Sequence, residues 1–262
     1  MTKFHAASLR LLAAGAALLL GATAASAQIT LKFAAEDKEL YPTYVGNGSE
    51  TLAEKPGTTV ELIRLVAQDL GFKAEFVRAP WRRCLDLLKE GAVDAVVNGS
   101  FSAARLEFGA FPMAGDKADP ARRSLSWTYT LYRKKGSPAS WDGKAFSGLA
   151  APIGAPLGYS IVADLKKLGV QIDEAGDAEI NLRKVSAGRI SGAVLLREAT
   201  DPLIKSKAMT DLEVVLPPIE VKDYYIMLSH QLVKKDAALA ERFWTKFAEI
   251  RDAKGAAIEA KY

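Results

Sequence analysis

The first half of the chain alternates between short apolar runs and segments with helical periodicity. From Trp81, apolar residues recur at i, i+3, i+4 and i+7, the spacing of a helix with one buried face, and Gly91 ends the segment. Short apolar runs on either side are typical of buried strands. The pattern predicts strands at 29–34, 74–77 and 93–97 and helices at 58–70 and 80–90. This β-α-β-α-β order requires right-handed crossovers and therefore predicts a mostly parallel sheet.

The second half repeats this arrangement. It predicts strands at 152–155, 170–172 and 190–195 and helices at 161–168 and 177–187. The segments 85–91 and 182–188 both end a helix in glycine, and an apolar strand follows each of them at the same spacing. The repetition supports two related lobes. A last amphipathic helix begins near Asp236, and its apolar face consists of Leu239, Phe243, Phe247 and Ile250.

Two β-rich segments, 125–133 and 223–229, bracket the second set of elements and are the natural connections between two lobes. We therefore predict an α/β protein with two βαβ lobes joined by a two-strand hinge. Lobe 1 is expected to comprise residues 28–126 and 223–262, and lobe 2 residues 127–222. Such a hinge permits bending while it restricts other motion.

The N-terminus has the order of segments found in cleaved secretory signals. Lys3 and Arg10 precede an apolar run at 11–22, and small residues then end in Ala25-Ser26-Ala27. A membrane-spanning helix needs ~20 apolar residues, whereas this run holds about a dozen. We therefore expect residues 1–27 to be a signal peptide that is removed on export. No cysteine directly follows the run, so we expect no lipid anchor.

The composition of the remaining chain excludes several classes of function. Cleavage would leave 235 of the 262 residues and would remove two cations and no acid, which lowers the formal net charge from +4 to +2. That charge argues against nucleic acid as a partner, because phosphate binding needs clustered Lys and Arg. Cys84 is the only cysteine, and His230 would be the only histidine left. A lone histidine cannot form a histidine-rich metal site, nor a Ser-His-Asp relay without the other members, and we expect no catalytic residues, no metal and no cofactor.

Polar residues gather where the strand 93–97 ends. Asn98 to Ser100 follow that strand and lie at the carboxyl edge of the sheet, where open α/β folds bind ligands. Arg105 falls in the first turn of a predicted short helix, where a cation opposes the helix dipole by up to ~1 kcal/mol. A ligand carboxylate held by the guanidinium fork would offset that cost. The alternative is an ion pair within the protein, with Glu107 or Asp94 as the partner.

Three further candidates lie near the starts of predicted helices. Trp81 could stack on a ligand or fill the core, and its neighbour Arg82 could point to solvent or into the mouth of a cleft. Ser160 belongs to a glycine-containing turn before a helix of the second half. The N-terminus of that helix could meet an anion from the opposite side.

The loop after the first strand supplies the remaining candidates. Tyr41 and Tyr44 lie there, and amphipathic rings in such loops often line a site. Glu36, just past the strand, is either an acceptor for a cationic group or an exposed loop acid. Spacing alone leaves both roles open.

Two motifs carry a resemblance to a known family. An L-x-x-G-x-x-D-A element occupies residues 88–95, and an S-x-[ST]-x-x-R stretch occupies residues 100–105 before an F-x-x-P region at 108–112. In these features the chain resembles the family 3 solute-binding proteins of bacterial ABC transporters. The resemblance covers the whole mature chain, and it implies a two-lobed type II periplasmic-binding-protein fold and a periplasmic location.

The resemblance also implies roles for several residues. Arg105 matches the family's arginine that clamps the carboxylate of the ligand. The other implied contacts are Ser100, the backbone at Asn98, Trp81, Tyr41 and, from the second lobe, Ser160.

One position departs from the family's pattern. Amino-acid binders of this family usually place an acid after the last strand of the second βαβ set, where it holds the ligand ammonium, and the matching residue here is Leu196. Arg82, Arg105 and Arg197 together would suit an anionic ligand such as a dicarboxylate. A shift of two residues would give the ammonium role to Glu198. Amino acids and other organic acids therefore both stay open as ligands.

We therefore predict a periplasmic, monomeric protein that closes its lobes over a small polar, carboxylate-bearing molecule and does no chemistry on it. An ABC permease in the inner membrane would recognise the closed form. Two alternatives stay open. One is a sensory or accessory periplasmic protein, whose sequence could look identical, and the other is a lyase-type enzyme on the same fold with Glu36 as its acid.

Overall fold

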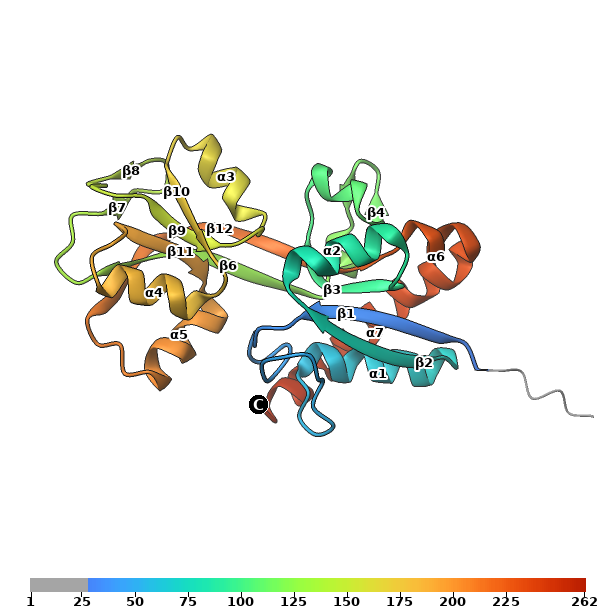
Figure 1. The fold of residues 1–262 in the computed structure, drawn as a ribbon. Coiled ribbons are helices and arrows are strands. Elements are labelled where there is room, and N and C mark those ends of the chain that lie inside the picture. Colours follow the sequence, from blue (N-terminus) through green and yellow to red (C-terminus); the bar gives the residue numbers. More distant parts are fainter. Residues whose placement is uncertain (1–27) are drawn as a thin grey trace, which may run out of the picture.

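The computed structural model describes residues 28–262, and the predicted signal peptide 1–27 lies outside them. The described chain is an α/β protein built on one eight-stranded sheet (Figure 1). Across the sheet the strands are β10 (Ile172–Ala175), β9 (Ile153–Pro156), β11 (Gly192–Leu196), β6 (Leu125–Lys134), β12 (Leu212–Leu228), β3 (Ala95–Ser100), β1 (Thr30–Glu36) and β2 (Lys73–Ala79). Within residues 28–262, no helix has both the length and the apolar character needed to cross a membrane.

The first lobe is formed around the parallel strands β3, β1 and β2. Successive side chains of a strand point to opposite faces of the sheet. Accordingly, Phe33 of β1 joins the apolar cluster under α1 (Thr58–Leu70) and α7 (Ala237–Glu259), and Ala34 joins the cluster under α2 (Trp81–Glu90). The lobe's shorter elements are η1 (Ala103–Glu107) and η2 (Pro120–Arg122), both 3-10 helices, the strands β4 (Met113–Ala114) and β5 (Lys117–Ala118), and α6 (His230–Lys235).

The second lobe is formed around the parallel strands β10, β9 and β11. The same alternation places Val194 of β11 in a cluster with α3 (Ile161–Lys167) and Leu195 in a cluster with α4 (Ala178–Ser186). The remaining elements are α5 (Arg197–Ser206) and the hairpin of β7 (Ser140–Trp141) and β8 (Phe146–Ser147). Both lobes thus have the predicted βαβ order, whereas α5 is a helix that the sequence pattern did not predict.

Two antiparallel strands, β6 and β12, run between the lobes (Figure 1). β6 pairs with β11 on one side, and β12 pairs with β3 on the other, so these two strands form the predicted hinge. β12 begins at Leu212, earlier than the predicted strand at 223–229. Its register shifts between Val215 and Glu220, where Pro217 and Pro218 lie. Within this break, the two prolines remove no hydrogen bond from the ladder. The strand therefore continues past them, although proline normally ends a strand. The predicted lobe boundaries at 126/127 and 222/223 stay a prediction.

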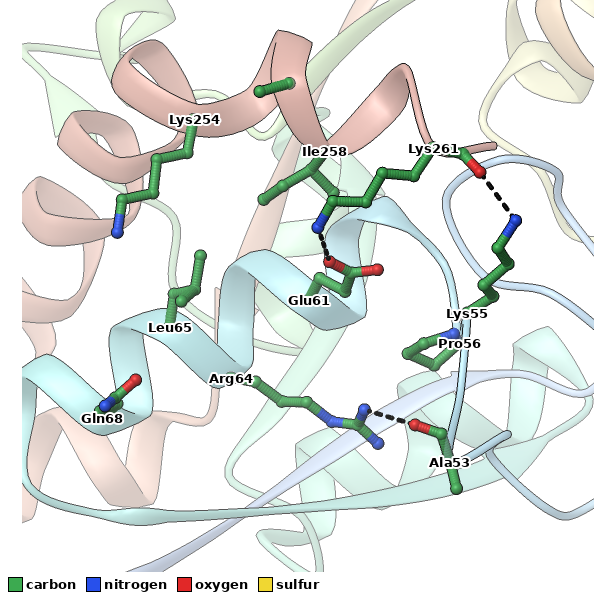
Figure 2. A pocket seen from close by; sticks show the side chains of 11 residues that line it. Ala53, Lys55, Pro56, Glu61, Arg64, Leu65, Gln68, Lys254, Ile258 and Lys261 are labelled. Carbon is green, nitrogen blue, oxygen red and sulfur yellow. Dashed lines mark hydrogen bonds and ion pairs between the residues drawn. The ribbon is translucent and has the colours of Figure 1, made fainter.

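Lys261 and Tyr262 make hydrogen bonds to residues 55–61, the segment that leads into α1. Figure 2 shows the contacts of Lys261 with Glu61 and Lys55. The hydroxyl of Tyr262 accepts the N–H of Gly57 at 2.9 Å and donates to Glu61 at 2.7 Å. Lys261 pairs with Glu61 at 3.1 Å, and its carbonyl accepts a hydrogen bond from Lys55 at 3.0 Å. The loop 37–57 is therefore held at its carboxyl end.

Replacing Gly57 by alanine should destabilise the protein more than replacing Gly48. Both glycines have a left-handed φ, 118° and 99°, but a Cβ on Gly57 would lie 2.3 Å from the carbonyl oxygen of Thr43, while one on Gly48 would meet nothing within 4 Å. We expect Gly48→Ala to lower the free energy of unfolding by about 1–2 kcal/mol, and Gly57→Ala by about 2 kcal/mol more. Urea-induced unfolding measures both values, and equal losses would contradict the close packing of this loop.

Candidate functional site

Side chains of both lobes meet between the carboxyl ends of β1 and β3 and the start of α3. They leave a void of about 10 Å³, no more than the space that one water molecule needs. We call this cluster the central site. The residues lining it are Leu40, Tyr44, Trp81, Asn98, Ser100, Arg105, Tyr129, Tyr159, Leu196 and Tyr224.

Of these lining residues, only Arg105 carries a formal charge. Its side chain is 6% exposed, and burial lowers the pKa of the guanidinium. Nη1 donates to the carbonyl oxygen and to Oγ of Ser100, at 2.9 and 2.6 Å, and the guanidinium lies 5.1 Å from the ring centroid of Trp81. No ion pair within residues 28–262 includes Arg105. The site therefore holds a buried cation without a counter-charge.

The protein acids that could have neutralised Arg105 are engaged elsewhere. Glu107 pairs with Lys89, and the carboxylate of Asp94 accepts the backbone N–H of Lys32 at 2.7 Å. The helix that carries Arg105 is a five-residue 3-10 helix, and Ser102 makes no side-chain capping bond to it. The free-energy cost of the charge on Arg105 therefore comes mainly from burial, and the dipole of this short helix adds little to that cost.

Three contacts cross between the lobes at the central site. Oγ of Ser100 lies 2.8 Å from Oγ of Ser160, and the ring of Tyr159 meets Trp81 edge-on at a centroid distance of 6.1 Å. The hydroxyl of Tyr159 donates to Glu36 at 2.5 Å. Gly158 lets the chain approach the first lobe because its φ is 75° and a Cβ there would lie 3.0 Å from Cγ of Arg82. The lobes thus meet through the turn at 158–160.

Glu36 is buried at the edge of the central site. It is 6% exposed and accepts hydrogen bonds from Tyr159 and, at 3.4 Å, from Tyr44. The pKa of its carboxyl group is raised from 4.5 to about 7, mainly by burial and in smaller part by Asp37, against the lowering effect of the two tyrosine hydroxyls and Arg78. Glu36 therefore changes charge near neutral pH.

The model of the family described as bacterial extracellular solute-binding proteins, family 3, matches residues 40–262. The chain belongs to this family. The match confirms the resemblance predicted from the motifs at 88–95 and 100–105. No match was found among curated proteins.

Solved structures share the fold of this family 3 protein at low sequence identity. A histidine kinase sensor domain with similarity to periplasmic binding proteins has a TM-score of 0.72 and 21% identity, with 90% of this chain and 96% of that chain covered. The GluR0 ligand-binding core from Nostoc punctiforme, in complex with L-glutamate, has a TM-score of 0.69 and 12% identity over 88% and 98% of the chains. A substrate-binding protein of an ABC uptake transporter from Streptococcus pneumoniae, with bound histidine, has a TM-score of 0.68 and 15% identity over 89% and 92%. These likenesses confirm the two-lobed α/β fold.

The structure of this solute-binding protein brings six of the nine predicted site residues together. Arg105, Ser100, Trp81, Asn98 and Ser160 meet at the central site, and Glu36 is bonded to two of its tyrosines. The side chain of Asn98 is committed within the first lobe, because it donates to Thr59 at 3.2 Å and accepts from Ser124 at 2.8 Å.

The other three predicted site residues lie outside the central site. Tyr41 packs edge-on against Tyr262, with the ring centroids 6.4 Å apart. Tyr44, from the same loop, lines the central site in its place. Arg82 is exposed, and its guanidinium lies 3.6 Å from the carboxylate of Glu174 of the second lobe. Arg197 lies along the surface of α5, where it pairs with Asp201 at 3.1 Å.

Leu196 and Glu198 are the two positions between which the sequence left the ammonium role open. Leu196 lines the central site, whereas the carboxylate of Glu198 accepts the backbone N–H of Thr128 at 3.0 and 3.1 Å. No group of three or more His, Cys, Asp or Glu side chains within residues 28–262 could hold a metal ion.

The sequence did not single out the tyrosines of the hinge strands. Tyr129 of β6 and Tyr224 of β12 line the central site, and their hydroxyl oxygens lie 2.9 Å apart. Burial raises the pKa of both phenols, so they stay neutral beside Arg105. The one signal that could have indicated them is the presence of a tyrosine in each of the two predicted hinge segments.

Replacing Glu36 by glutamine should make the stability less dependent on pH. The folded protein holds a proton on Glu36 between pH 4.5 and about 7 that the unfolded chain has lost, so stability falls as the pH rises through this window. The full loss is on the order of 3 kcal/mol. Glutamine still accepts from Tyr159 and carries no charge, so the Tm of Glu36→Gln should exceed that of the wild type at pH 8 and match it below pH 4.5.

Thermal unfolding between pH 4 and 8 measures this difference. Glu107→Gln, which changes an exposed acid, serves as the control and should follow the wild-type profile. Parallel profiles for Glu36→Gln and the wild type would contradict the raised pKa of Glu36.

Proposed function

We propose that this family 3 protein binds a small polar solute that bears a carboxylate, either an amino acid or another organic acid, and closes its lobes over it. The buried guanidinium of Arg105, without a protein counter-charge, is the observation that carries the proposal. Taking a cation out of water costs several kcal/mol, and an anion in direct contact is what offsets such a cost. A carboxylate matches the guanidinium because two parallel N–H donors can hold its two oxygens.

The donors of Arg105 support this role. All its hydrogen bonds within residues 28–262 come from Nη1, so Nε and Nη2 remain for a ligand. Aromatic rings of both lobes surround the guanidinium, and the Trp81 ring beside it would pack against the ligand's apolar part. Ser100 and Ser160 would supply hydroxyl groups from opposite sides.

Glu36 bears on the choice between the two ligand classes. Its carboxyl group is buried beside Tyr44 and Tyr159, which both line the central site, and it can lose its proton near neutral pH. A ligand cation would favour the ionised form of Glu36. An amino acid would then place its carboxylate on Arg105 and its cationic group toward Glu36, since Leu196 replaces the family's usual ammonium partner.

Closure is the proposed mechanism. Contacts that a ligand makes with both lobes exist only in the closed form, so they shift the population toward it. We propose that the protein acts in the periplasm after removal of residues 1–27, and that an ABC permease of the inner membrane receives the closed, monomeric form. No catalytic step is part of this proposal.

A sensory role is the second candidate, and the likeness to a histidine kinase sensor domain favours it. The same closure would then report the ligand to a membrane receptor. The two roles share one binding site.

Arg105→Ala should abolish ligand binding. A thermal-shift screen of amino acids, organic acids and polyamines first identifies the ligand, because one present at 100 times its Kd stabilises the folded form by ~2.7 kcal/mol. Removing Arg105 should weaken binding of the best hit by about 100-fold or more, which isothermal titration calorimetry measures. Arg197→Ala removes an exposed arginine and should leave the Kd unchanged. An unchanged Kd in Arg105→Ala would refute the carboxylate clamp.

A further inference from the structure

A second hollow lies between the lobes, next to the central site. It has a volume of about 650 Å³, and its walls are the loop 36–47 of the first lobe and the helices α4 and α5 of the second. We call it the outer cleft. Leu40, Tyr159 and Leu196 line both the outer cleft and the central site, so these three side chains form the wall between the two spaces.

The sizes of the two spaces differ greatly. The central void of about 10 Å³ is filled by side chains, whereas the outer cleft falls in the range of 300–1,000 Å³ that is typical of small-molecule sites. A single small amino acid would leave most of the outer cleft empty. Tyr159 is the bulkiest part of the dividing wall, and its position depends on one hydrogen bond to Glu36 and an edge contact with Trp81. Moving this ring aside would join the two spaces.

The walls of the outer cleft combine apolar surface with an excess of negative charge. Ala199, Pro202 and Leu203 of α5 form an apolar floor opposite Leu40 and Tyr41. The acids lining the cleft are Glu36, Glu39, Asp177 and Glu179, and the cations are Lys38 and Lys207.

Part of this negative charge has no cationic partner. Lys207 is paired with Glu179 at 3.2 Å. Glu39 and Asp177 accept backbone N–H groups, both at 2.7 Å, and neither forms an ion pair within the described residues. A cationic group on a ligand would therefore be favoured in this cleft.

We propose that the outer cleft is a second compartment of the ligand site, and that the solute is an elongated amino-carboxylate whose apolar chain passes Tyr159 and ends in an amine in this cleft. The proposal rests on the proposed function, because it takes the carboxylate of the solute to lie on Arg105. The apolar floor accommodates the chain, and the unpaired carboxylates receive the amine.

A series of probes of increasing length tests the proposal. Isothermal titration calorimetry compares 4-aminobutanoate, 6-aminohexanoate and 8-aminooctanoate, and it compares the last with octanoate, which lacks the amine. Each methylene that enters the cleft should tighten binding by about fourfold, so the longest probe should bind at least about tenfold more tightly than the shortest. Octanoate should bind more weakly than 8-aminooctanoate, by about two- to fivefold. No gain with length, no effect of the amine, or no binding by any probe would overturn the proposal.

Filling the outer cleft provides the matching variants. Ala199→Phe and Ser206→Phe place a ring in the cleft, and the second change is at an exposed position that should not disturb folding. Each should lower the affinity for 8-aminooctanoate by about tenfold and leave that for 4-aminobutanoate within about twofold. Lys205→Phe, on the same helix but outside the cleft, should change neither. Equal losses for both probes in the cleft variants would overturn the proposal.

Arg105→Ala separates this proposal from the one on which it rests. It should abolish binding of both probes. Binding that survives in Arg105→Ala would remove the proposed function, whereas a missing length effect with Arg105-dependent binding would remove only the outer compartment.

Discussion

A buried guanidinium without a buried counter-charge sets the energetics of this protein. Ser100 supplies two acceptors to Arg105, and the face of Trp81 supplies a cation–π contact, which is worth about 2 kcal/mol when desolvated. These contacts offset only part of a desolvation cost of several kcal/mol. The first lobe tolerates the imbalance because α1, α2 and α7 cover both faces of its sheet with large apolar clusters. The cost left at Arg105 is available as binding energy for an anion.

The contacts between the lobes are compatible with the closure that we propose. At the central site they consist of the Ser100–Ser160 and Tyr159–Glu36 hydrogen bonds and the edge contact of Tyr159 with Trp81. A hydrogen bond contributes about 1 kcal/mol net, so opening the site costs little compared with unfolding either lobe. The strands β6 and β12 pair with each other and connect the two lobes. A ligand that bridges the lobes can therefore decide between the open and closed forms with a few kcal/mol.

Much of the fold could be predicted from the sequence because its elements are amphipathic and end in glycine. Helix α2 shows this, with Trp81, Cys84, Leu85 and Leu88 buried and a left-handed Gly91 at its end. Helix α5 was missed because it has no side-chain cap at Leu196 and contains Pro202. The first part of β12 was missed because the register break that accommodates Pro217 and Pro218 is a property of the paired strands.

Site residues that belong to a sequence motif could be predicted, whereas those brought to the central site by the packing of the chain could not. The spacing from Ser100 to Arg105 predicted that these two side chains act together, and in the structure Nη1 of Arg105 contacts Ser100. The loop 37–57 gave no such spacing. A local turn pairs the backbone of Leu40 with that of Tyr44, and Tyr44 rather than Tyr41 lines the central site. Tyr129 and Tyr224 approach each other only because of the antiparallel register of β6 and β12, which no local pattern encodes.

The most direct test of the account uses the ligand and leaves the protein unchanged. Isothermal titration calorimetry would compare the best natural ligand with its carboxamide, which has the same shape and no negative charge. If the ligand's anion balances Arg105, the carboxamide should bind at least about 100-fold more weakly, since the buried cation is then left unpaired. Equal affinities for the acid and the amide would contradict the account.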